Sequence, residues 1–145
     1  MRFQVKLKAK TVWTARKRAL LRDALQYANV TLGLDNVDMT VVVKLSGDAY
    51  APGMCCNFGN DVLLVKVSGN QTEEEIVETL FHELTHVRQY ALGQLEDVGE
   101  QVVYWLGHYY RGDFENTDSL EYWNAPWEVE ARQVGWKLLN DYYQS

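Results

Sequence analysis

Short runs of β-branched and apolar residues in the first half of the chain predict strands. Residues 3–7 alternate between apolar and polar side chains, the period of a half-buried strand. Residues 39–45, MTVVVKL, indicate a buried strand, because β-branched side chains fit a pleated surface. Residues 54–58 and 62–67 flank a Gly-Asn-Asp turn and predict a hairpin. We therefore expect a small, mostly antiparallel sheet of three to four strands.

Apolar residues recur at helical spacing in longer stretches, which predict helices at 11–32, 72–92, 96–110 and 127–143. Residues 111–124 are polar and acidic and predict a connection, after which Pro126 suits a helix start. The helix at 72–92 is the best defined, because Thr72 and Glu75 form a capping-box pair at its start. Together the patterns predict one α+β domain over 1–145, with the sheet packed against the 72–92 helix and two to three further helices.

The 72–92 helix contains His82-Glu83-Leu84-Thr85-His86, an HExxH sequence. His82 and His86 are four residues apart, so both imidazoles leave the same side of the helix, one turn apart. Two ring nitrogens placed in this way can bind one Zn²⁺ at about 2.0–2.1 Å. Glu83 lies next to the first histidine, where it can hold the zinc-bound water and take its proton. The motif predicts a catalytic zinc site with one ion per chain.

A catalytic zinc ion usually has a third protein ligand besides two histidines. The metzincin pattern is excluded, because Gln89 and Leu92 stand where it needs glycine and histidine. The remaining candidates are acidic residues and one histidine that follow the motif: Glu96, Glu100, Glu115, Glu121, Glu128, Glu130 and His108. Glu128 is favoured, because it lies in the first turn of a predicted helix, where it is held rigidly. Ala131 then lets two helices approach closely.

With HExxH and a downstream Glu128-x-x-Ala131, the sequence resembles the gluzincins, metallopeptidases whose third zinc ligand is a glutamate on a separate helix. The resemblance covers residues 72–92 and 122–139 and is closest to the most compact members. It implies a zincin-like catalytic domain that hydrolyses peptide bonds, with the third ligand at Glu128 and Glu130 as the second choice. Arg132 departs from the family pattern, which has an acid or asparagine after the alanine.

The oxyanion formed during hydrolysis needs a hydrogen-bond donor besides zinc. Tyr122 is our first choice, because it is the tyrosine closest to Glu128 in sequence. The alternatives are aromatic or imidazole side chains in the preceding segment: Tyr104, Tyr109, Tyr110 and His108. The expected substrate is a peptide or protein, whose backbone would lie along the edge of the 54–67 hairpin.

Composition and charge bear on the partners and the location of the protein. The 145 residues carry a net charge of −6, but residues 1–22 hold eight basic and no acidic side chains. This basic segment is compatible with binding to nucleic acid. We favour a segment that either contacts the acidic body of the same molecule or is simply solvated, because no recognisable nucleic-acid motif accompanies the charge. No apolar run is long enough for a membrane span and the N-terminus lacks a signal-peptide pattern, so we expect a cytoplasmic protein with no membrane contact. The pattern does not predict an oligomeric state.

Two further interpretations of the motif remain. The domain can be a regulatory or binding module that keeps the fold and the metal but cuts nothing, or cuts one dedicated partner. Glu83 argues against this, since a structural metal site needs no base beside its ligand. Peptide deformylase shares HExxH and adds a cysteine ligand, which would be Cys55 or Cys56, but its glycine-rich motifs are missing.

Overall fold

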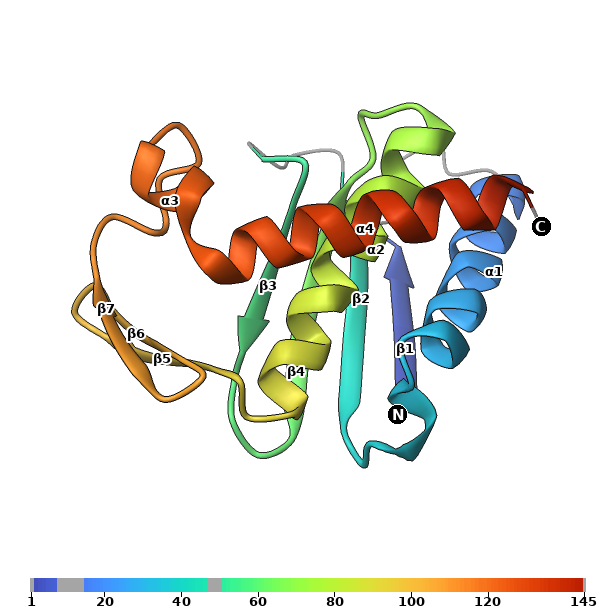
Figure 1. The fold of residues 1–145 in the computed structure, drawn as a ribbon. Coiled ribbons are helices and arrows are strands. Elements are labelled where there is room, and N and C mark those ends of the chain that lie inside the picture. The colour runs from blue at the N-terminus through green and yellow to red at the C-terminus, as the bar shows by residue number, and fades with distance from the viewer. Residues whose placement is uncertain (1, 8–14, 47–50, 145) are drawn as a thin grey trace.

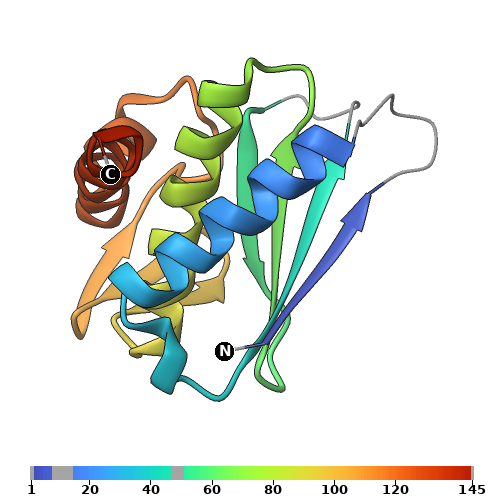
Figure 2. The same ribbon diagram turned by 90° about the vertical axis from the view of Figure 1, so that its right-hand side faces the viewer.

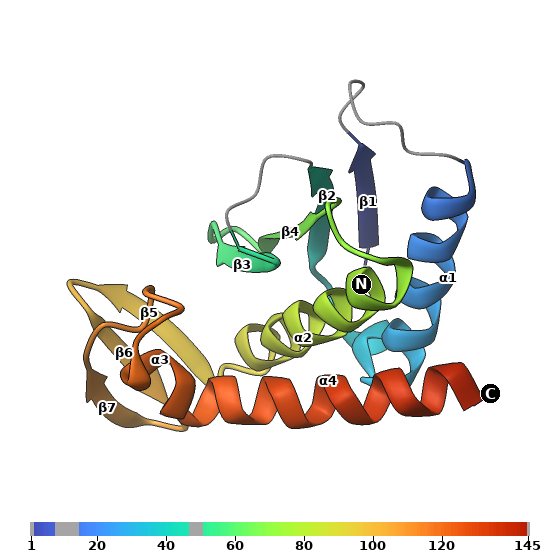
Figure 3. The ribbon, with the colours of Figure 1, turned by 90° about the horizontal axis from the view of Figure 1, so that it is seen from above.

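The computed structural model describes residues 2–7, 15–46 and 51–144. The first part of the predicted helix 11–32, residues 11–14, and loop residues 47–50 lie outside the described residues. The described chain forms three layers, with a four-stranded sheet, two helices on one face of it, and a further helix across the outside (Figures 1 and 3). A second, three-stranded sheet lies beyond the end of the central helix. The expected α+β class is confirmed.

The larger sheet has the order β1-β2-β4-β3. Its strands are β1 (Arg2–Leu7), β2 (Thr40–Ser46), β3 (Gly53–Asn57) and β4 (Val62–Ser68). The predicted hairpin is confirmed, because β3 and β4 pair antiparallel. The β1–β2 and β2–β4 pairings are parallel, however, so this sheet is mixed. Helix α1 (Ala15–Thr31) carries the chain from β1 back to the start of β2, and such a helical crossover makes the two strands parallel (Figure 2).

The central helix is α2 (Glu73–Ala91), which lies between the larger sheet and helix α4 (Figure 3). The predicted capping box is present: Thr72 Oγ1 accepts from the Glu75 backbone N–H, and Glu75 Oε1 accepts from the Thr72 N–H. One side of α2 packs into the main core through apolar side chains that include Ile76, Leu80, Phe81 and Leu84. The opposite side carries the HExxH histidines toward α4. This division leaves the polar motif between two packed layers.

The helix predicted at 96–110 is wrong. The segment forms three antiparallel strands, β5 (Leu95–Gly99), β6 (Val102–Trp105) and β7 (His108–Arg111). Leu106 and Gly107 form the two-residue turn between β6 and β7, with φ values of 51° and 81° that no helix allows. Val103 and Trp105 are buried while Tyr104 between them is exposed, which is the period of a strand.

The last part of the chain folds back over α2. A short helix, α3 (Leu120–Asn124), precedes α4 (Pro126–Gln144), which begins at Pro126 as predicted. Ala131 is fully buried, and a Cβ added to Gly135 would lie 3.3 Å from the His82 backbone nitrogen. These two small residues let the backbones of α2 and α4 approach closely beside the first histidine of the motif.

Two side chains of the basic N-terminal segment pair with acids of the same chain. Arg2 lies 2.7 Å from Asp38, and Arg16 lies 2.8 Å from Glu73 at the start of α2. Both pairs are exposed and contribute little to stability, but they agree with contact against the acidic body. Within the described ranges, no helix combines the length and the apolar composition that crossing a membrane requires.

Candidate metal centre

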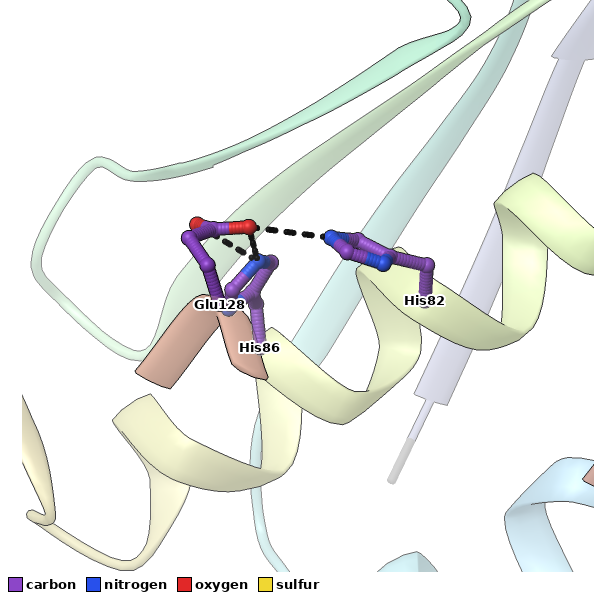
Figure 4. Close-up of side chains that lie close together, drawn as sticks. All are labelled: His82, His86 and Glu128. Carbon is purple, nitrogen blue, oxygen red and sulfur yellow. Dashed lines mark hydrogen bonds and ion pairs between the residues drawn. The ribbon is translucent and has the colours of Figure 1, made fainter. Parts of the chain in front are cut away.

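The structure brings together His82, His86 and Glu128 (Figure 4). The two histidines come from successive turns of α2, and Glu128 comes from the first turn of α4, 42 residues after His86. One Glu128 oxygen lies 3.1 Å from Nε2 of each histidine, and the other lies 3.0 Å from His86 Nε2. Three possible ligand atoms from two helices therefore converge on one point.

The donor set suits zinc. In a tetrahedral site with bonds of 2.0–2.1 Å, neighbouring ligand atoms lie roughly 3.4 Å apart. The nitrogen–oxygen separations of 3.0 and 3.1 Å are close to that value. Two imidazoles and one carboxylate are a set found in catalytic zinc sites, where the fourth position is left for water or substrate. The three side chains therefore form a group that could hold a metal ion.

The charges of the cluster are coupled in the metal-free protein. Burial alone would lower the pKa of His86, but its hydrogen bond with Glu128 and the charges of Glu128 and Glu83 raise that pKa to about 9. Burial would raise the pKa of Glu128, but hydrogen bonds from His82 and His86 lower it to about 2. Both shifts favour a protonated His86 beside an ionised Glu128 in the metal-free site.

Glu83 lies beside this cluster and is buried, with 6% of its surface exposed. Its burial raises the pKa of the carboxyl, and the nearby His86 and His82 oppose that rise. Gly53 on β3 packs directly against it, since an added Cβ would lie 3.2 Å from Glu83 Cγ and 2.5 Å from Thr79 Cγ2. A carboxylate held in this way, with a raised pKa, suits a general base.

A cleft of about 1040 Å³ runs between β3 and the second sheet, and two of the three cluster residues lie on its wall. Glu83, His86 and Glu128 line it together with Cys55 and Cys56 of β3. In the described residues β3 is the last strand of its sheet, so its outer edge faces no further strand. The cleft therefore joins a sheet edge to the candidate metal ligands.

Tyr122 also lines the cleft, from helix α3. Burial raises the pKa of its hydroxyl, and the neighbouring Glu128 and Glu83 carboxylates raise it further. Arg132 holds α3 in place: it donates to the Trp123 carbonyl oxygen, and its guanidinium lies 3.8 Å from the centre of the Trp123 ring. The arginine that departs from the gluzincin pattern therefore fixes the helix that carries Tyr122.

The other candidates lie apart from the cluster. Glu130 contacts Gln89 and lies 3.9 Å from Arg88, instead of facing the histidines. His108 is exposed on β7. Neither cysteine belongs to the group of converging ligand atoms, and burial followed by the Glu83 charge raises the pKa of the Cys55 thiol well above its usual value. Among the alternative tyrosines, Tyr109 is exposed and Tyr110 packs against Trp127.

Gln89 is the residue of the site that the sequence analysis missed. It is fully buried, and its Oε1 lies 2.7 Å from His86 Nδ1. Its Nε2 donates to the Trp127 carbonyl oxygen at 3.0 Å and to Glu130 Oε1 at 3.1 Å. The available signal was its position three residues after His86, on the same side of a helix.

Comparison of the chain with models of known protein families, with curated proteins and with solved structures finds no match. The resemblance to the gluzincins therefore stays a prediction, supported by the motif residues and by the geometry of the site.

Proposed function

We propose that this chain is a zinc-dependent metallopeptidase of the gluzincin type. The observation that carries the proposal is the convergence of His82, His86 and Glu128 from two helices, with the buried Glu83 beside them. A purely structural metal site has no use for a buried carboxylate next to its ligands, since such a group costs free energy to bury. Zinc is the proposed metal, because two imidazoles and a carboxylate suit Zn²⁺.

The residues divide the chemistry between them. When bound, zinc would supply a Lewis acid that polarises the scissile carbonyl. It would also lower the pKa of water, so that the water can give up a proton near neutral pH. Glu83 takes the proton of the attacking water and gives it to the leaving amine, for which its raised pKa is suited. Tyr122 keeps its proton across the neutral range and donates a hydrogen bond to the oxyanion.

The substrate is a peptide or protein that lies in the cleft in extended form. The free edge of β3 offers main-chain hydrogen bonds to an added strand, and β3 lines the same cleft as Glu83 and Glu128. Binding by strand addition does not require particular side chains, which allows a range of sequences to bind.

The metal content of two variants distinguishes Glu128 from Glu130 as the third ligand. We expect about one zinc per chain in the wild-type protein, measured by elemental mass spectrometry after purification. Glu128→Ala should lose most of it, whereas Glu130→Ala should keep it, since Glu130 faces Gln89 and Arg88. A wild-type protein that binds no zinc when zinc is supplied would contradict the proposed function. Equal zinc content in both variants would mean that the third ligand is another residue.

Glu83→Gln separates a peptidase from a module that only binds. The substitution keeps the size of the side chain but removes the base, so zinc should be retained and cleavage of a peptide library should fall by 10²-fold or more, the usual scale for a lost proton-transfer group. Cleavage at the wild-type rate would show that Glu83 is not the base. A wild-type protein that binds zinc and peptides without cleavage would favour the regulatory module instead.

A further inference from the structure

Gln89 connects the two helices that supply the metal ligands, and its amide has a defined orientation. An amide oxygen only accepts hydrogen bonds, whereas an amide nitrogen only donates them. At one end the amide contacts two acceptors, the Trp127 carbonyl and a Glu130 carboxylate oxygen. Those contacts require the –NH₂ group there, so the oxygen faces His86 Nδ1. The oxygen and nitrogen of an amide have nearly the same shape, so it is the hydrogen-bond network that assigns their positions here.

This orientation decides which nitrogen of His86 carries a proton. Because Gln89 Oε1 cannot donate, the contact of 2.7 Å requires a hydrogen on Nδ1. Once His86 loses the second proton, which Nε2 carries toward Glu128 in the metal-free protein, Nε2 has a free lone pair while Nδ1 stays protonated. Nε2 is the atom that faces Glu128 in the cluster. The same contact therefore prepares His86 to bind a metal through Nε2 and prevents the ring from turning.

The amide nitrogen acts on the other helix. Trp127 immediately precedes Glu128, so the bond from Gln89 to the Trp127 carbonyl holds the first turn of α4 beside α2. Gln89 has no exposed surface, and all three of its contacts are made at once. A single side chain thereby sets both the ring of one ligand and the backbone next to another.

We propose that Gln89 is the positioning residue of the metal centre, fixing the His86 tautomer and aligning the start of α4, and that it thereby sets the zinc affinity. The inference rests on the proposed zinc site. It assigns Gln89 a role that requires an amide and excludes a carboxylate. A glutamate at this position would face Glu130 with no proton between them and would leave the Trp127 carbonyl without its donor.

The test compares zinc affinities by competition with a chelator. Gln89→Leu keeps the approximate shape of the side chain but removes every hydrogen bond, and should weaken zinc binding about 10- to 100-fold, as loss of a ligand's supporting hydrogen bond generally does. Gln71→Leu is the matched control, because Gln71 makes hydrogen bonds to Pro52, Ser68 and Thr79 away from the cluster. That variant should bind zinc as the wild type does.

A pair of charge-altering variants tests the need for an amide. Gln89→Glu should also bind zinc more weakly than the wild type. Adding Glu130→Gln restores a donor facing residue 89, so the double variant should recover affinity relative to Gln89→Glu alone. If Gln89→Glu binds zinc as tightly as the wild type, the proposed use of the amide nitrogen is wrong.

Nitrogen NMR of the zinc-loaded protein gives a readout that a general loss of stability would not produce. In the wild type, His86 should show zinc on Nε2 and a slowly exchanging proton on Nδ1. In folded Gln89→Leu that proton should exchange rapidly. A wild-type protein with one bound zinc, together with an unchanged Nδ1 proton and affinity in Gln89→Leu, overturns the role of Gln89 and leaves the metal centre standing. A wild-type protein without zinc overturns the metal centre itself.

Discussion

Glu128 is the residue on which the chemistry of the site depends. Its two oxygens lie between the Nε2 atoms of His82 and His86, at the place a metal ion would share with them. In the metal-free protein the hydrogen bonds and opposite charges of Glu128 and the histidines raise the pKa of His86 and lower the pKa of Glu128. Proton and metal therefore compete for the same atoms.

This competition predicts a pH-dependent stability for the metal-free protein. The pKa of folded His86 is about 9, above its ordinary value of 6.5, so the folded protein holds this proton more tightly than the unfolded chain. The stabilisation is complete below pH 6.5 and is lost as the pH rises through 9. Thermal melting in the presence of a chelator should show a falling melting temperature across that window.

Glu128→Gln is the control for this prediction. An uncharged amide no longer raises the pKa of His86, so the melting temperature should change much less between pH 6.5 and 9. A similar slope in the wild type and in Glu128→Gln would assign the pH dependence to groups elsewhere in the chain.

The residues of the site differ in how far sequence alone can predict them. His82, Glu83 and His86 follow from helical spacing, which is a local property. Glu128 could be preferred over Glu130 because Ala131 follows it by three residues, as in the Glu-x-x-Ala pattern of the gluzincins. Gln89 could not be assigned a role, because one of its partners is the backbone carbonyl of Trp127, and a backbone atom carries no signal in the sequence.

At the scale of elements, local signals were reliable where they agreed with one another. The capping box at Thr72 and the proline at Pro126 each lie at a helix start in the structure. Residues 96–110 were misread because their apolar side chains fall by chance at helical spacing. Gly99 and Gly107 both have positive φ and mark the turns of a meander, and they were the signal against a helix.

The contact between β3 and α2 gives a prediction for a single strand. Gly53→Ala should push β3 away from α2, because the new Cβ would overlap Thr79 Cγ2 at 2.5 Å and crowd the Lys66 carbonyl oxygen at 3.0 Å. The hydrogen bond from Thr79 to Gln71 holds that threonine in place. We expect kcat/KM for peptide cleavage to fall roughly 10- to 100-fold, since displaced substrate contacts are costly.

Adding Thr79→Ser to Gly53→Ala tests the cause. Serine lacks the methyl group that the alanine would overlap but keeps the hydroxyl that contacts Gln71. The double variant should therefore recover part of the lost activity while zinc content stays unchanged in both. If Thr79→Ser gives no recovery, the loss does not come from this contact.

At the scale of the whole molecule, the chain order explains both what was predicted and what was not. The α+β class follows from the content of strands and helices. The parallel pairing of β1 with β2 depends on the route of the chain through α1, and that of β2 with β4 depends on β3, which lies between them in the chain. Periodicity does not report strand direction. The meeting of α2 and α4 was expected from Ala131, but the close approach of Gly135 to His82 emerges only from packing.

Zinc should stabilise the whole fold, because Glu128 lies 46 and 42 residues after the two histidines, on another helix. Free zinc at 100 times its dissociation constant adds about 2.7 kcal/mol to the free energy of unfolding. For a chain of this length that corresponds to a rise of roughly 6–10 °C in melting temperature. Calorimetry with and without zinc should show this rise in the wild type and in Glu83→Gln, which keeps every ligand.

Glu128→Ala is the comparison, because it lacks the ligand from α4. Its melting temperature should respond little to zinc. A rise equal to that of the wild type would mean that the stabilising ion binds elsewhere.

The length of α4 gives the site a mechanical property. Gly135 rests on the backbone of His82, seven residues from Glu128 on one side and seven from Tyr142 on the other. Each arm is about 10 Å long, and the far arm ends where Tyr142 packs on Tyr27 and donates to the Asp23 carboxylate of α1. The helix therefore contacts α2 at its midpoint, beside His82, the first candidate metal ligand. A tilt that moves the Tyr142 end by one ångström moves Glu128 by about the same distance the other way, enough to break a metal bond.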